Sequence, residues 1–125
     1  MPATFSKDER LCSRRLIDRL YAEGHRFMAF PYSVQWLLVD DPGCRQVMIV
    51  APKRRFHHAV DRNRVKRLTR ECYRLRKQQL YAALDERRQG LVFSMVYTHS
   101  DILTYDQLGR KMDRLIANLI VVSSQ

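Results

Sequence analysis

The chain has 125 residues, enough for one domain (residues 1–125) around a single hydrophobic core, and its apolar fraction of 46% argues against wholesale disorder. No apolar run approaches the roughly 20 residues of a membrane helix, and the N-terminal residues lack a signal-peptide core, so we expect a soluble, cytoplasmic protein without membrane contacts. Its three scattered cysteines predict neither disulfides nor a zinc site, whereas the net charge of +10 indicates a polyanionic partner.

The first predicted helix has two possible starts. Ser6 and Glu9 have the spacing of a capping box, whereas Ser13 could cap a shorter helix that follows an extended lead. Gly24 is a plausible end for either helix. The local pattern leaves both starts open.

Two strands are predicted next, because residues 32–39 and 46–51 are rich in β-branched and aromatic side chains. The turn sequence Asp-Asp-Pro-Gly separates them, so we expect the two strands to pair as a hairpin. Another strand is predicted at residues 91–97, after Gly90. Tyr32 and Trp36 are more typical of core aromatics than of ligand contacts.

Two further helices are predicted on either side of that last strand. Residues 59–80 show helical periodicity without Gly or Pro, and residues 105–122 form a closing amphipathic helix. The first of these helices has an apolar stripe that we expect to face the core: Val65, Leu68, Cys72 and Leu75. The closing helix has a similar stripe: Leu108, Met112, Leu115, Ile116 and Leu119.

Most of the positive charge lies in one short segment. Residues 53–77 contain eleven basic and two acidic residues, whereas the other 100 residues carry a net charge of only +1. Polar residues gather opposite the apolar stripe of the helix: Arg62, Asn63, Lys66, Arg67, Arg70, Arg74 and Lys77, with Arg64 and Arg76 at the border. Surface ion pairs could neutralise such a face, but Glu71 is the only local acidic partner, so the pattern favours phosphate binding.

The same segment resembles a known family. Residues 59–67 read Ala-Val-Asp-Arg-Asn-Arg-Val-Lys-Arg and match the Ala-Val-x-Arg-Asn-Arg-x-Lys-Arg signature of the protein subunit of bacterial ribonuclease P, which continues to Arg-Glu at residues 70–71. Similarities in the N-terminal lead and in the approach to the helix extend the resemblance over nearly the whole chain. The resemblance implies an α+β fold, a two-layer α/β sandwich with a small, mostly antiparallel sheet of about four strands, three helices and a left-handed β-α-β crossover.

The resemblance also implies a function. The family's protein joins a catalytic RNA and assists it in removing the 5′ leader from precursor tRNA, while the RNA and its Mg²⁺ perform the hydrolysis. No catalytic residue, metal ligand or small-molecule substrate is therefore expected in the protein. The residues that would contact RNA are Lys53, Arg54, Arg62, Asn63, Arg64, Lys66, Arg67, Arg70 and Arg74. Ile17 and Tyr21 would line a cleft for the single-stranded leader, where Tyr21 can stack on unpaired bases and Ile17 can only pack.

Other interpretations are open at this point. His57 and His58 could suggest a metal site or a general base, but adjacent side chains point apart and no carboxylate cluster accompanies them, so a helix-start or RNA-contact role is favoured. A general or ribosome-associated RNA-binding protein could use the same basic helix. A DNA-binding protein could use residues 59–80 as a recognition helix, although so long an Arg-rich stripe is more typical of phosphate binding. A self-sufficient nuclease is disfavoured, because the sequence has no catalytic triad pattern or phosphate-binding loop.

Overall fold

The computed structural model describes residues 5–124, and its four strands form one sheet in the order β1-β2-β4-β3. The strands are His25–Ala29 (β1), Tyr32–Val39 (β2), Arg45–Val50 (β3) and Gly90–Tyr97 (β4). β2 pairs antiparallel with β1 and with β4, whereas β3 pairs parallel with β4. The expectation of a small, mostly antiparallel sheet of four strands is confirmed.

The strand next to β2 is not the one that the sequence predicts. The expected hairpin between residues 32–39 and 46–51 is wrong, because β4 lies between β2 and β3 and pairs Phe93 with Trp36 on one side and with Val47 on the other. β4 is uncharged and almost wholly buried, which suits the centre of a sheet that helices cover on both faces. The hairpin partner of β2 is instead β1, whose exposed, polar start carries no strand pattern in the sequence.

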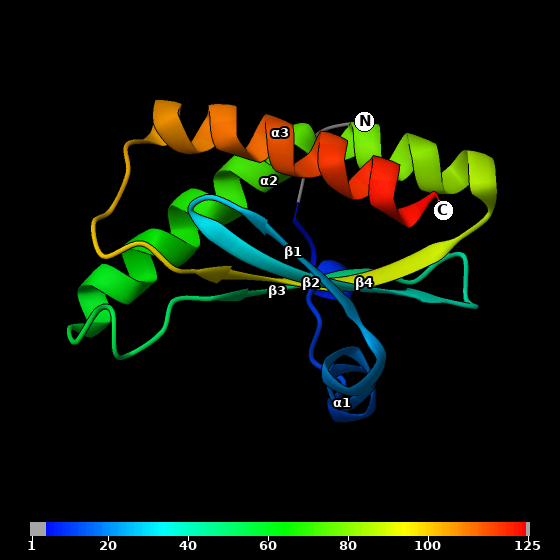
Figure 1. Ribbon diagram of the computed structural model, residues 1–125, viewed down its shortest axis with the longest axis horizontal. Coiled ribbons are helices and arrows are strands. Elements are labelled where there is room, and N and C mark those ends of the chain that lie inside the picture. The colour runs from blue at the N-terminus through cyan, green and yellow to red at the C-terminus, as the bar shows by residue number, and fades with distance from the viewer. Residues whose placement is uncertain (1–4, 125) are drawn as a thin grey trace.

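Helices lie on both faces of this sheet, as Figure 1 shows. α2 (Ala59–Arg87) and α3 (Tyr105–Ser123) run side by side over one face, and α1 (Arg14–Glu23) lies across the strands on the other. A short 3-10 helix, η1 (Lys7–Glu9), precedes α1. The two long helices and the sheet form the expected two-layer α/β sandwich, to which α1 adds a partial cover on the opposite face.

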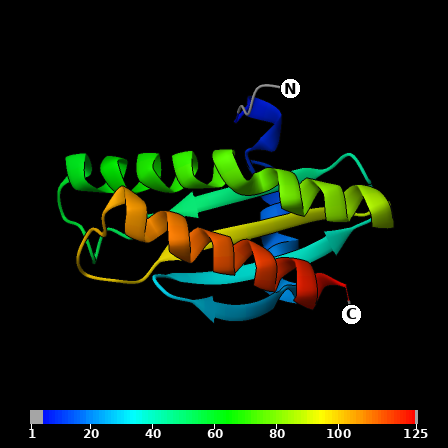
Figure 2. The same ribbon diagram turned by 90° about the horizontal axis from the view of Figure 1, so that it is seen from above.

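The connection from β3 through α2 to β4 is left-handed. In Figure 2, α2 is nearer the viewer than the sheet, and β3 and β4 point to the left with β4 below β3. When the strands are turned to point upward, with α2 in front, the chain therefore moves leftward from β3 to β4. Nearly all such connections move rightward, so the hand implied by the family resemblance is confirmed against the general rule.

Both predicted helix starts near the N-terminus are used. Ser6 and Glu9 form a capping box on η1, and the Ser13 hydroxyl accepts a hydrogen bond from the Leu16 backbone N–H at 3.3 Å and caps α1. Gly24 ends α1, as expected. The chain therefore turns at η1, extends to the edge of β3 and only then enters α1; we call residues 5–12 the N-terminal lead.

The main core lies between the sheet and the layer of α2 and α3. Tyr32, Trp36 and Cys72 are buried in it, so the interpretation of these residues as core is confirmed. The five apolar residues predicted for the inner face of α3 are buried there as well. A smaller cluster around Leu20 and Leu37 lies beneath α1 on the other face of the sheet.

α2 is longer than predicted, and its buried side changes along its length. Val65 is buried and Leu68 is partly buried, as expected, but Leu75 is 48% exposed, so its assignment to the core is wrong. Lys77, expected on the outward cationic face, is only 4% exposed, so that assignment is also wrong. An α-helix has 3.6 residues per turn, so residues that follow a fixed repeat shift gradually around its axis. Over the 29 residues of α2, the positions that face the sheet and α3 therefore do not follow one constant spacing.

Candidate nucleic-acid interface

The N-terminal half of α2 presents its cations along the outer edge of the sheet, next to β3. Arg64 and Arg67 are exposed, as is Asn63, and Lys66 and Arg70 are partly buried where the helix approaches the sheet. Within residues 5–124, none of these four cations forms an ion pair. Because like charges three and four residues apart repel each other along a helix, an anion bound here would relieve that repulsion.

Arg62 differs from its neighbours, because it also holds the chain that leads into α2. Its Nη1 donates hydrogen bonds to the backbone carbonyls of Phe56 at 2.8 Å and His57 at 3.0 Å. The same loop carries Lys53 and Arg54, both exposed. Arg62 therefore fixes the loop that brings two further predicted RNA contacts to the start of α2.

The two adjacent histidines lie where α2 begins. His58 is the N-cap residue, although its side chain makes no capping hydrogen bond, and His57 is exposed beside it. Their position at a helix start agrees with the sequence interpretation. Among residues 5–124, no three His, Cys, Asp or Glu side chains are grouped closely enough to hold a metal ion.

Arg74 has a local acidic partner, unlike the cations before it on α2. Its guanidinium donates to both carboxylate oxygens of Glu71, with Nε 3.1 Å from Oε2. These hydrogen bonds hold the pKa of Glu71 below its ordinary value. Part of the Arg74 charge is therefore compensated within the protein itself.

A groove runs between α2 and the N-terminal lead. Lys66 and Arg70 form one wall, Phe5 and residues 10–12 form the other, and residues 47–49 of β3 form the floor of a hollow of about 280 Å³. A second hollow of about 210 Å³ shares Phe5 and Arg70 and continues along α2. We call the two hollows together the α2 groove; its floor is largely apolar and cations line both walls.

The N-terminal lead is attached to both the sheet and α2. The Leu11 backbone N–H donates to the Val47 carbonyl at 3.0 Å, beside a parallel bridge between Arg10 and Val47. The Phe5 ring packs edge-on against Tyr73 of α2, with the ring centroids 6.1 Å apart. These contacts turn an otherwise extended segment into a wall of the α2 groove.

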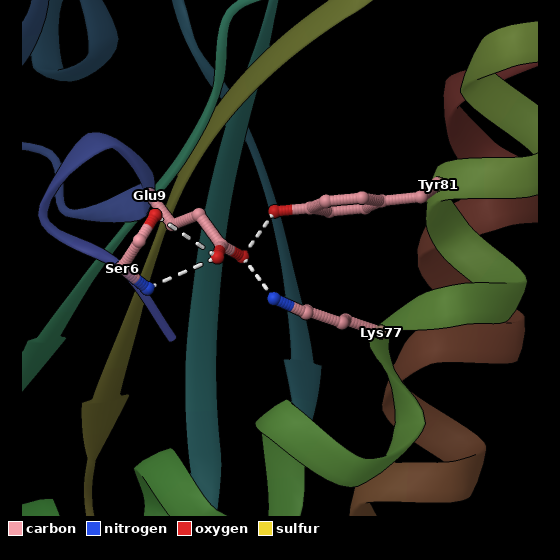
Figure 3. A network of polar contacts seen from close by, with 4 residues as sticks. All are labelled: Ser6, Glu9, Lys77 and Tyr81. Atoms are coloured by element: carbon pink, nitrogen blue, oxygen red, sulfur yellow. Dashed lines mark hydrogen bonds and ion pairs between the residues drawn. The ribbon is translucent and has the colours of Figure 1, made fainter. Parts of the chain in front are cut away.

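An ion pair between the buried Lys77 and the partly buried Glu9 anchors this wall at η1, and Figure 3 shows its contacts. One oxygen of the Glu9 carboxylate accepts hydrogen bonds from Lys77 Nζ at 2.5 Å and from the Tyr81 hydroxyl at 2.6 Å, and the other accepts from the Ser6 backbone N–H at 3.1 Å. Burial by itself would raise the pKa of Glu9, but the hydrogen bonds from Lys77 and Tyr81 outweigh burial and hold that pKa below its ordinary value. Glu9 is therefore ionised at neutral pH and ties the lead to α2.

Ile17 and Tyr21 share one side of α1. Leu16 and Arg19 lie on the other side and line a hollow next to the turn between β2 and β3. The Ile17 side therefore faces the part of the sheet that α1 leaves uncovered. Ile17 packs against the cluster beneath α1, whereas Tyr21 is 53% exposed.

Met48 connects this uncovered face with the α2 groove. It lies on the floor of the groove and also packs against the cluster that Ile17 joins. The structure does not bring Tyr21 and Lys66 into one hollow, so the predicted contact residues occupy two adjoining surfaces. Sequence analysis missed Met48, because alternation along a strand predicts which residues share a face and not which face stays uncovered.

None of the helices described in residues 5–124 is long and apolar enough to cross a bilayer.

The α2 groove offers cations on its walls and an apolar floor to an extended polyanion, so its geometry is that of a binding surface.

Comparison with known proteins agrees with this geometry. The family described as Ribonuclease P matches residues 5–119. Over 122 residues the chain is 34% identical to the ribonuclease P protein component of Porphyromonas gingivalis, which covers 94% of this chain and 89% of that protein. Over 81 residues it is 36% identical to the ribonuclease P protein component of Chlorobium phaeobacteroides, with 59% and 56% of the two chains covered.

Solved structures of ribonuclease P proteins share the fold. The protein from Staphylococcus aureus superposes with a TM-score of 0.73 at 18% identity, and covers 90% of this chain and 96% of its own. The protein from Thermotoga maritima superposes with a TM-score of 0.67 at 20% identity, and covers 88% and 96%. At these identities the two matches support the α+β architecture alone.

Proposed function

The chain belongs to the ribonuclease P family, and from this premise we propose that it is the RNA-binding protein subunit of a ribonuclease P ribonucleoprotein. In that assembly it assists a catalytic RNA in the endonucleolytic removal of the 5′ leader from precursor tRNA, which leaves a 5′ phosphate on the tRNA. It is the accessory subunit of an endoribonuclease, and we assign it with its RNA partners to the cytoplasm.

The observation that carries the proposal is the uncompensated cationic face of α2 beside a groove. Each cation that meets a phosphate releases condensed counterions into solution, which favours binding independently of RNA sequence. Arg64 and Arg67 are exposed for such contacts, and Lys66 and Arg70 line the α2 groove. By lowering phosphate repulsion, these side chains would allow the catalytic RNA and its substrate to come together at physiological salt.

The side of α1 next to the uncovered sheet face is the proposed site for the precursor leader. Tyr21 is exposed there, and an aromatic ring stacks on unpaired bases of any sequence. Ile17 supports the helix from below by packing on the sheet and contributes apolar contact. A site of this kind suits a single-stranded leader whose sequence varies between tRNAs.

Catalysis is proposed to stay with the RNA subunit. Mg²⁺, held mainly by the RNA, would supply the activated water and stabilise the charge that develops on the phosphate. The protein side chains described above bind and orient RNA. Their cations would reduce the Mg²⁺ concentration that the assembly needs, because they replace part of the counterion charge.

Reconstitution tests this function directly. Purified protein is added to a bacterial ribonuclease P RNA at low Mg²⁺, and the cleavage of precursor tRNA is followed. We expect cleavage only when both components are present. Robust cleavage by RNA-free protein, lost in His57→Ala or His58→Ala, would place the chemistry in the protein, and no stimulation of the RNA would contradict the subunit role.

The assignment of Tyr21 to the leader has its own test. Tyr21→Ala should weaken the assembled enzyme's binding to a precursor with a leader of several nucleotides by about 1–3 kcal/mol, since one stacking platform is lost. A precursor with a one-nucleotide leader is the matched control and should bind as it does to the unchanged enzyme. Equal weakening of both precursors would show that Tyr21 does not act on the leader.

A further inference from the structure

A second cationic surface lies on α3, at the opposite edge of the sheet from the α2 groove. Gln107, Arg110, Lys111 and Arg114 follow one another along the helix and line a hollow of about 300 Å³. Charge counting along the sequence does not reveal it, because the residues outside 53–77 are nearly balanced. The helical spacing of residues 107, 110, 111 and 114 collects these side chains on one side of α3, and the tertiary structure places Phe30 beside them.

The charge of this surface is not compensated within the described residues. Across residues 5–124, no ion pair forms at Arg110, Lys111 or Arg114. The neighbouring carboxylate on α3, Asp113, is instead paired with Arg76 of α2 at 2.8 Å. Three cations within about two turns of a helix repel each other, so an anion at this place would stabilise the arrangement. The physical argument is the one that identifies the cationic face of α2.

An exposed aromatic ring lies beside these cations. Phe30, in the turn between β1 and β2, is 51% exposed, and Lys111 Nζ lies 5.6 Å from the centre of its ring. The His99 ring packs edge-on against Phe30 with the centroids 5.0 Å apart. The turn itself is held by Thr98, whose backbone N–H donates to the Pro31 carbonyl at 2.8 Å. Phe30 is therefore presented from a supported turn.

We propose that Phe30, Gln107, Arg110, Lys111 and Arg114, which we call the α3 patch, form a second RNA-binding site. The site takes a single-stranded segment: one unpaired base stacks on Phe30, and the cations bind the flanking phosphates. An aromatic ring next to a row of cations can bind both the base and the phosphates of unpaired RNA. The guanidinium groups suit bidentate contacts with phosphate. This inference rests on the proposed function and adds a second contact to it.

The RNA segment at the α3 patch is a different one from the segment at the α2 groove. Lys111 lies over the turn next to β1, whereas the groove lies over β3, the opposite edge strand. Three strand spacings separate these edges, a distance of about 14 Å. Two RNA molecules of the assembly offer the same chemistry, the catalytic RNA and the precursor tRNA, and the experiment distinguishes them.

The experiment compares the unchanged protein with Arg110→Gln/Arg114→Gln and with Phe30→Leu. In the first arm each protein binds bacterial ribonuclease P RNA over a series of monovalent salt concentrations, and in the second the assembled enzyme binds precursor tRNA. In the arm that uses the patch, the double substitution should make the slope of log affinity against log salt shallower by about 1.4–1.8. Phe30→Leu should weaken binding in the same arm by about 5- to 150-fold with the slope retained.

Arg19→Gln is the matched control, because it removes a partly exposed cation that already has a partner, Glu23, at 3.1 Å and lies on the side of α1 away from Ile17 and Tyr21. Its slopes should equal those of the unchanged protein, and thermal unfolding checks that every variant is folded. A shallower slope for the double substitution in either arm supports the proposal and identifies the RNA. Unchanged slopes in both arms, with normal binding by the unchanged protein, overturn the α3 patch alone. If the unchanged protein binds neither RNA, the proposed function and this inference both fail.

Discussion

The two halves of α2 use the same kind of side chain for opposite purposes. In the N-terminal half, Lys66 and Arg67 lie at or toward the surface without an ion pair among the described residues. In the C-terminal half, Lys77 is enclosed with Glu9, and Arg87 donates to the Ile120 carbonyl at 2.9 Å. The first set is available to RNA and the second holds the N-terminal lead and α3 in place.

This difference teaches that a cationic stripe is not one functional unit. The N-terminal half of α2 borders the groove, where Arg67 is exposed and Lys66 and Arg70 line the wall, so its cations stay accessible. Farther along, η1 covers the helix, and a lysine there must find a carboxylate because a buried charge without a partner is costly. The neighbouring elements, and not the side-chain type, decide which task a cation performs.

The largest effect is expected when the Lys77–Glu9 ion pair in the C-terminal half of α2 is broken. Lys77→Met keeps the apolar stem but leaves the largely enclosed Glu9 carboxylate without its cation, so we expect the free energy of unfolding to fall by up to about 3 kcal/mol in urea denaturation. Lys66→Met is the matched control on the same helix and should stay within about 0.5 kcal/mol. Equal losses for the two variants would contradict the division between the halves.

The reciprocal effect is expected on RNA binding. Lys66→Met should weaken binding to the catalytic RNA by about 1.5–3 kcal/mol, because one charge-assisted contact to phosphate is lost. The slope of log affinity against log salt should become shallower by about 0.7–0.9. Folded Lys77→Met protein should keep the slope of the unchanged protein. A shallower slope for Lys77→Met, with none for Lys66→Met, would reverse the assignment.

A pH titration sharpens the role of the buried pair. The folded-state pKa of Glu9 lies below its ordinary value, so its contribution to stability is present above that ordinary value and is lost as the pH falls through the folded pKa. We expect unfolding free energies measured from neutral to acidic pH to decline more steeply for the unchanged protein than for Glu9→Gln. Parallel curves would show that Glu9 contributes nothing through its charge.

The smallest effect is expected at the border between the halves. Leu75 is nearly half exposed although its spacing predicts a core position, so Leu75→Gln should change the free energy of unfolding by less than about 0.5 kcal/mol. Chemical denaturation measures this value. A loss of several kcal/mol would mean that Leu75 packs in the core and that the buried side of α2 does not drift.

Local sequence patterns were sufficient to predict the structure where the conformation of a segment depends mainly on its own residues. The bounds of residues 32–39, the inner face of α3 and the cap at Ser13 agree with expectation, because side-chain alternation, helical periodicity and capping act over a few residues. The cationic segment and its signature also lie within one stretch of chain. The fold class and the family could therefore be predicted from the sequence.

The sequence by itself thus determined the elements other than β1, the apolar face of α3 and the cationic signature of α2, all of which depend on neighbours along the chain. Only the tertiary structure decided that β4 separates β2 from β3, that Lys77 is enclosed by Glu9 and Tyr81, and that Phe30 lies beside the cations of α3. Each of these facts joins segments that are distant in sequence. Such contacts form because the buried area and the paired charges of the whole chain are optimised together, and no local pattern records that sum.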